Sequence, residues 1–137
     1  MDPDRTGRST QADEGSTALS AQLEEDRPGT LAKALGCVSA AGINIDGYAE
    51  IGGVVHVLSP DLRATHACLQ DAGFRIAQEQ EVVVVSVADE PGAAARVFQR
   101  IAESHINIKY SYLATRNRLV IAANDPRAVM EALSAEA

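Results

Sequence analysis

The stretch Asp89-Glu90-Pro91-Gly92 is followed, fifteen residues after its proline, by Ile106-Asn107-Ile108, and this combination determines the predicted fold. The same combination occurs once more, nearer the start of the chain. There, Asp26-Arg27-Pro28-Gly29 is followed at the same distance by Ile43-Asn44-Ile45, so that equivalent residues lie 63 positions apart. A repeat of this length is one supersecondary unit. The sequence therefore predicts two copies of one unit within 137 residues.

Each copy places proline and glycine where an apolar run gives way to a segment with helical periodicity. Proline suits the first turn of a helix, because its missing N–H would have no helical partner there. Asp26 and Asp89 are predicted to act as N-caps at the positive end of the helix dipole. The glycine leaves the first-turn N–H groups accessible to an anionic ligand. Each copy therefore offers a candidate ligand-binding turn, although the same residues also make an ordinary helix start.

The composition excludes several classes of protein. Hydrophobic residues make up 46% and aromatic residues 4%, which predicts an aliphatic core. The net charge of -7 argues against nucleic acid or an anionic membrane surface as a partner. Cys37 and Cys68 have no metal-ligand spacing and suit a reduced, cytoplasmic protein, in which they are interpreted as small buried hydrophobes. No apolar run reaches the ~18 residues of a membrane span, and no signal peptide is recognised.

Hydrophobic periodicity predicts an alternation of strands and helices. Strands are expected at residues 17–24, 43–50, 54–58, 74–80, 82–87, 106–114 and 118–123. Helices are expected at residues 28–41, 59–71, 91–104 and 124–133. Gly42 should end the first helix in a left-handed conformation, with His105 in the equivalent position of the second copy. Strand alternation would point Tyr110 and Tyr112 into the core together with Ile106 and Ile108.

This order of elements gives an α+β fold made of two ferredoxin-like βαββαβ units in tandem, with antiparallel sheets and helices packed on one face. Residues 1–16 are polar and are expected to form a disordered tail. The first unit would span residues 17–81 and the second residues 82–137. The second unit lacks its last strand, so residues 82–87 would have a bare edge that another copy or a second chain should cover.

The Asp-x-Pro-Gly turn with Ile-Asn-Ile opening the next strand resembles the ACT domain, the small regulatory module of amino-acid-metabolism enzymes. The resemblance covers residues 17–133 and is greatest to free-standing proteins with two ACT copies and no catalytic domain. It implies an amino acid bound where ACT copies meet, lined by the strand-to-helix turn and the start of the following strand. The residues that match these positions are Asp26, Arg27, Pro28, Gly29, Thr30, Asn44 and Ile45 in the first copy, and Asp89, Glu90, Pro91, Gly92, Ala93, Asn107 and Ile108 in the second.

The chemistry of these residues suits an amino acid independently of the resemblance. A helix N-terminus supplies N–H donors for a carboxylate, and an aspartate or asparagine oxygen accepts from an ammonium group. No catalytic motif, metal cluster or cofactor site is recognised, so the protein is predicted to be a non-catalytic sensor. The bare strand edge predicts a homodimer. Phosphate chemistry at Arg27 is disfavoured by the acidic residues before it. The alternative is a structural subunit that docks on a separate metabolic enzyme without binding a ligand.

Overall fold

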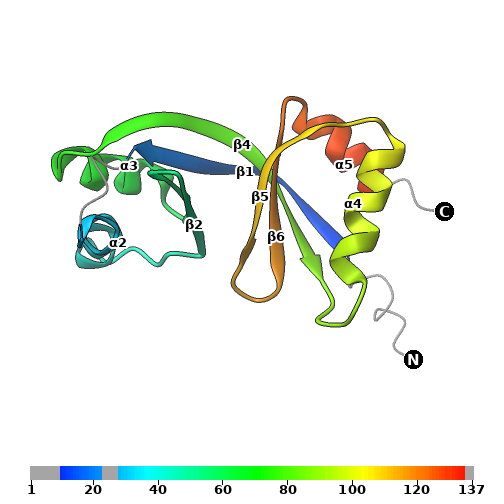
Figure 1. Ribbon diagram of the computed structural model, residues 1–137, viewed down its shortest axis with the longest axis horizontal. Helices are drawn as coiled ribbons and strands as arrows, with labels where there is room; N and C mark the ends of the chain where they lie inside the picture. Colours follow the sequence, from blue (N-terminus) through cyan, green and yellow to red (C-terminus); the bar gives the residue numbers. More distant parts are fainter. Residues whose placement is uncertain (1–9, 23–27, 135–137) are drawn as a thin grey trace. The chain divides into compact units, whose positions relative to one another are not determined.

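The computed structural model describes residues 10–22 and 28–134. Within them the chain runs through six strands and four helices (Figure 1). The strands are β1 (Thr10–Gln22), β2 (Gly47–Ile51), β3 (Val54–Leu58), β4 (Arg75–Val87), β5 (Ile108–Ala114) and β6 (Arg118–Ala123). The helices are α2 (Thr30–Ala40), α3 (Leu62–Asp71), α4 (Ala93–Glu103) and α5 (Pro126–Ser134). The described residues form two compact units, one of residues 17–80 and one that joins residues 10–16 to 81–134.

The unit of residues 17–80 has the strand order β2-β3-β1-β4. Its β2–β3 hairpin turns at Gly52 and Gly53, which both have positive φ, as the Gly-Gly pair predicts. Alternate side chains of β1 and β3 pack against one face of α2 and α3. The buried core that results consists of Leu19, Ala21, Ala34, Val38, Val55, Val57, Leu69 and Phe74. The expectation of helices on one face of an antiparallel sheet is confirmed in this unit.

The second unit repeats the plan with β4, β6 and β5 under α4 and α5. Its core consists of Val83, Val85, Val97, Ile101, Leu119, Ile121, Ala123, Val129 and Leu133. Residues 82–85 are all at most 3% exposed. Because successive strand side chains point to opposite faces, this run is buried on both faces, as its β-branched composition predicts.

The fourth strand of the second unit comes from the beginning of the chain. β4 lies between β6 and β1 in the sheet, and residues 10–16 of β1 group with the second unit. Both units therefore have the ferredoxin-like order 4-1-3-2, although the last strand of the second unit is first in sequence. The expectation of a disordered tail through residue 16 is wrong from Thr10 onward, and the predicted bare edge of residues 82–87 is covered within the chain. Residues 1–9 lie outside the described part.

β1 and β4 are longer than expected because each continues from one unit into the other. β4 joins the two predicted strands at residues 74–80 and 82–87 without a break. Its pairing with β6 covers Val83 to Ser86, and its first half belongs to the unit of residues 17–80. A strand carries backbone donors and acceptors on both edges along its whole length, so the two halves of one strand can belong to different units of the same sheet.

The strands after α2 and α4 begin later than expected, at Gly47 and Ile108. Both helices end in a Schellman motif, in which the N–H of Ile43 donates to Val38 O (3.2 Å) and that of Ile106 to Ile101 O (3.4 Å). Gly42 (φ 78°) and His105 (φ 59°) hold the left-handed position before each isoleucine, as predicted. The first isoleucine of Ile-Asn-Ile therefore closes a helix and does not open a strand.

Tyr110 and Tyr112 lie on the opposite face from the one expected. The register of β5 against β6 shifts between Ile108 and Tyr110, so that Lys109 is an extra residue in a β-bulge. Beyond the bulge, Tyr110 and Tyr112 pair with Ala122 and Val120, whereas it is Ile121 and Leu119 that face the helices. The two tyrosine rings stack at 6.2 Å, and burial followed by the neighbouring Tyr110 raises the pKa of Tyr112.

The first testable prediction concerns the N-terminal half of β1. A chain that begins at Thr17 lacks the strand that completes the second unit, whereas a chain that begins at Thr10 keeps β1 whole. Because the shorter chain leaves β4 with an unpaired edge, it should have a lower Tm and a greater tendency to aggregate than the longer one. Thermal unfolding and light scattering of both variants measure the difference. Equal Tm values would contradict the assignment of residues 10–16 to this sheet.

Candidate functional site

The Pro-Gly pair of the second copy forms a type II turn before α4. In the second unit the N–H of Ala93 donates to Glu90 O (3.2 Å), and Gly92 has φ 87° and ψ -9°. These are the values of the third residue of a type II turn, for which proline is favoured at the second position. Gly29 has almost the same conformation, φ 91° and ψ -9°. The two copies therefore share one backbone geometry at the start of α2 and α4.

This geometry corrects the predicted capping. The N-caps of α2 and α4 are Gly29 and Gly92, so Asp89 is not an N-cap and the prolines precede the helices instead of occupying their first position. The other helix of each unit is capped by aspartate as usual, with Asp61 accepting from Ala64 N (3.1 Å) and Asp125 from Ala128 N (3.2 Å). A glycine N-cap supplies no capping side chain of its own, although Arg96 Nη1 would lie 3.0 Å from a Cβ added at Gly92.

The candidate turn residues differ in their exposure. Pro28, Gly29, Asp89, Glu90, Pro91 and Gly92 are exposed, Thr30 is half-buried, and Ala93 is buried. The carboxylate of Glu90 is held by Arg96, one turn into α4, at 3.2 Å. Ala93, the first residue of α4, is only 7% exposed. Asp26 and Arg27, the remaining candidates of the first copy, lie outside the described residues.

Asn44 and Asn107 occupy loops between a helix end and the following strand. Both are exposed, and each is followed by a half-buried isoleucine, Ile45 or Ile108, that packs against the core of its own unit. Asn44 Nδ2 donates to Asp46 Oδ1 (2.9 Å), which fixes its amide near the entrance to β2. Both asparagines were expected to lie within strands, but they precede the strands, so strand alternation does not determine where their side chains point.

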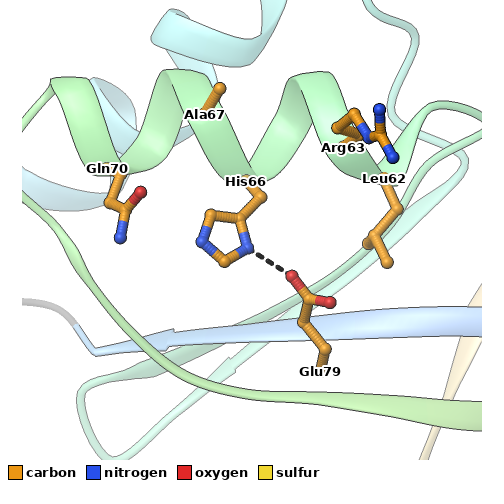
Figure 2. Close-up of a pocket in the computed structure, with 6 residues that line it drawn as sticks. All are labelled: Leu62, Arg63, His66, Ala67, Gln70 and Glu79. Atoms are coloured by element: carbon orange, nitrogen blue, oxygen red, sulfur yellow. Dashed lines mark hydrogen bonds and ion pairs between the residues drawn. The ribbon is translucent and has the colours of Figure 1, made fainter.

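A surface hollow lies elsewhere in the unit of residues 17–80, between α3 and β4 (Figure 2). Its volume is about 530 Å³, and it is lined by Leu62, Arg63, His66, Ala67, Gln70 and Glu79. His66 Nδ1 and Glu79 Oε2 are hydrogen-bonded across it, so the pair links helix to strand. None of the predicted site residues lines this hollow. The signal in the sequence was the polar stripe at positions 63, 66 and 70 of α3, which helical spacing puts on one face.

Further features bear on the chemistry that the described residues offer. No group of three or more His, Cys, Asp or Glu side chains in residues 10–22 and 28–134 is placed to hold a metal ion. Within the same residues no helix combines the length and apolarity of a membrane span. His56, in the middle of β3, bonds through Nδ1 to Ser20 Oγ (2.7 Å), and burial lowers its pKa. This pair joins two adjacent strands, so His56 has a structural role in the sheet.

The fold is that of known regulatory proteins. The chain resembles a protein from Bacteroides thetaiotaomicron with 24% identity over 88% of this chain and 87% of that one, at a TM-score of 0.77. It resembles the ligand-free regulatory subunit of aspartate kinase from Thermus thermophilus with 20% identity, coverage of 90% and 92%, and a TM-score of 0.65. It also covers 31% of Escherichia coli aspartokinase III, solved with lysine and aspartate, using 90% of its own length, at 14% identity and a TM-score of 0.61.

These similarities define the fold class: tandem ferredoxin-like units, the fold of the regulatory subunits of aspartate kinase. The predicted resemblance to ACT domains is thereby confirmed at the level of the fold. No protein-family model and no curated protein matches the sequence.

The second testable prediction concerns the turn glycines. Gly29→Ala and Gly92→Ala should each destabilise the protein by about 1–2 kcal/mol, because alanine is strained in the left-handed conformation. Gly36→Ala is the matched control, since Gly36 lies exposed within α2 with nothing within 4 Å of an added Cβ. That change should stabilise the protein by ~0.5–1 kcal/mol. Urea unfolding of the three variants tests the prediction, and a stabilising effect at Gly29 or Gly92 would contradict the turn geometry.

Proposed function

We propose that this protein is a non-catalytic regulatory module that binds a free amino acid at its Pro-Gly turns. The observation that carries the proposal is the duplicated turn, in which Gly29 and Gly92 start a helix with the same left-handed geometry and no side-chain cap. α3 and α5 begin without a Pro-Gly turn, because an aspartate side chain caps each of them. Two helix starts at equivalent positions, each without a capping side chain, suit the binding of a ligand carboxylate by backbone N–H groups.

The second group that an amino acid requires is an acceptor for its ammonium. Asn44 and Asn107 provide side-chain oxygens at equivalent places in the loops that follow the repeated helices, and Asp89 adds a carboxylate in the second unit. Asp26 and Arg27 belong to the same proposal by their position in the repeat. Escherichia coli aspartokinase III has been solved with lysine and aspartate, which makes these two amino acids the first ligands to test.

The site as proposed forms where ACT units meet, within the chain or between chains, in a cytoplasmic protein without a cofactor. Binding of the amino acid would regulate a separate metabolic enzyme. The other candidate function is a structural subunit that docks on such an enzyme without binding a ligand. It is favoured by apolar side chains on outer strands, since Ile51 on β2 is 62% exposed and Leu113 on β5 is 60% exposed.

The third testable prediction is the ligand response. A screen of the twenty amino acids should find one or a few that stabilise the protein, by ~2.7 kcal/mol at a hundred times the dissociation constant. Calorimetric titration should then show binding weakened by about 1.5–3 kcal/mol in Asn44→Ser or Asn107→Ser, because a hydrogen bond to a charged group is lost. Folding stability should barely change, since both residues are exposed.

Asn124→Ser is the matched control, because Asn124 is an exposed asparagine outside the repeated motif. It should bind the ligand as the unmodified protein does. A folded protein that responds to no amino acid at millimolar concentration would leave the structural subunit as the better account. Full affinity in both Asn44→Ser and Asn107→Ser would instead remove the asparagines from the site.

The fourth testable prediction is a homodimer that uses the outer edge of β2, where Tyr48 and Ile51 are exposed. Light scattering should give twice the 14.4 kDa of one chain. Ile51→Lys should shift the protein toward the monomer, because a charge replaces apolar surface at the contact, whereas Glu50→Lys on the same strand should not. A monomer at the highest soluble concentration would contradict the prediction, and loss of the dimer in Leu113→Lys alone would contradict the choice of edge.

A further inference from the structure

The two cysteines of the chain meet in the unit of residues 17–80. Cys37 lies on α2 and Cys68 on α3, thirty-one positions apart, and their Sγ atoms are 3.8 Å from each other. Both are free and half-buried, and both pack against the core of this unit. A role as small buried hydrophobes, which the sequence suggested, does not by itself explain a contact between the two sulfur atoms. The 137 residues contain no other cysteine, so the contact involves all the thiols that the protein has.

We propose that Cys37 and Cys68 form a reversible intramolecular disulfide, which makes the α2–α3 contact a thiol–disulfide modification site. Each thiol also donates to a backbone carbonyl one turn earlier in its own helix. Cys37 Sγ lies 3.2 Å from Ala34 O, and Cys68 Sγ lies 3.4 Å from Thr65 O. A disulfide requires the sulfurs to approach to ~2.05 Å, with Cβ atoms ~3.5–4.5 Å apart. The sulfurs, now 3.8 Å apart, must therefore move closer together before the bond can form.

The oxidant is a small-molecule disulfide such as glutathione disulfide. The thiolate of one cysteine attacks a sulfur of the oxidant, which forms a mixed disulfide and releases one glutathione thiolate. The second cysteine, as its thiolate, attacks the protein sulfur of the mixed disulfide and expels the second glutathione. The two protons of the protein thiols pass to the two released thiolates. The two cysteines together lose two electrons as the protein disulfide forms, and these electrons reduce the glutathione disulfide to two glutathione thiols. Excess glutathione reverses both steps.

The surroundings of Cys37 determine the pH dependence. Burial, followed by the hydrogen bond and the charge of Cys68, raises the pKa of the Cys37 thiol to about 11, against the opposing effect of Lys33. Because the thiolate is the reacting form, oxidation should accelerate as pH rises from 7 to 9. At neutral pH Cys37 is therefore protonated and slow to react with general thiol reagents.

The cross-link would act on the helix that presents the first Pro-Gly turn. α2 begins beside Gly29 and carries Cys37 in its second half, and the bond would tie it to α3. A disulfide that closes a loop of this length restricts the unfolded chain and so stabilises the folded one. Oxidation and ligand binding are separate properties, since the thiols are not among the residues proposed to bind an amino acid.

The fifth testable prediction is formation of this bond under native conditions. Reduced protein incubated with glutathione disulfide at pH 8 should lose about 2 Da, the mass of two hydrogen atoms. Reactive thiols should fall from two per chain to none, and a non-reduced peptide map should join Cys37 to Cys68. Tm should rise by several degrees on oxidation and return on reduction. Cys37→Ser and Cys68→Ser, with Cys37→Ala and Cys68→Ala as alternatives for folding, should show no rise.

A displaced pair provides the matched control. Cys37→Ser combined with Ser39→Cys keeps two cysteines but moves one along α2 to an exposed position. Its equilibrium constant for disulfide formation with glutathione should be lower by roughly tenfold or more, because the thiols are no longer placed together. Mixed disulfides alone, disulfides between chains, retention of both thiols, or a lowered Tm in the oxidised form would each overturn the proposal. None of these outcomes depends on whether the protein binds an amino acid.

Discussion

Hydrogen bonding along both edges of β4 is the constraint on which the second unit depends. The four valines at residues 82–85 are buried on both faces, so the backbone groups between them have no access to water and must be paired. β6 pairs with one edge, between Val83 and Ser86, and β1 lies on the other. Because the chain after β6 forms α5 and no further strand in its described part, the N-terminal residues supply the missing strand. The second unit is therefore built from two separate stretches of sequence, whereas the unit of residues 17–80 is continuous.

The two repeated helices are bounded at both ends by left-handed residues. Gly29 and Gly92 start α2 and α4, and Gly42 and His105 follow their ends. Both helices are consequently eleven residues long, and the loops that carry Asn44 and Asn107 begin at equivalent points. The repeat thus fixes backbone geometry first, and the equivalence of the proposed ligand groups follows from it. His105 shows that the constraint tolerates a residue other than glycine, at a cost in backbone strain.

In the unit of residues 17–80 the two functional proposals draw on different parts of the structure. The amino-acid site uses exposed backbone at a helix start, where affinity comes from N–H groups and a few polar side chains. The thiol pair lies between helices, where its reactivity is controlled by burial. α2 connects the two, since the Pro-Gly turn precedes its first residue and Cys37 lies seven residues later. A change in the packing of α2 is therefore a physical route by which oxidation would reach the turn. The hollow at His66 and Glu79, between α3 and β4, enters neither proposal.

The sequence by itself determined the local structure. The spacing of Pro-Gly and Ile-Asn-Ile predicted the repeat, the positions of the four helices to within a few residues, the Gly-Gly hairpin and the left-handed residues at 42 and 105. Each of these depends on a few neighbouring residues, so each can be inferred from them. The candidate turn residues were also found in this way, although their capping was assigned to aspartate where glycine performs it.

Only the tertiary structure decided which segments pair. Residues 10–16 read Thr-Gln-Ala-Asp-Glu-Gly-Ser, and nothing in that composition predicts a strand. Strand pairing uses backbone N–H and C=O groups, which every residue other than proline possesses. These residues pair because the buried backbone of the distant valines in β4 needs hydrogen-bond partners. The bulge at Lys109, which turned two tyrosines to the other face, is set by the match of β5 to β6. The contact between Cys37 and Cys68 likewise exists only because α2 and α3 pack on the same face, a relation between residues thirty-one positions apart.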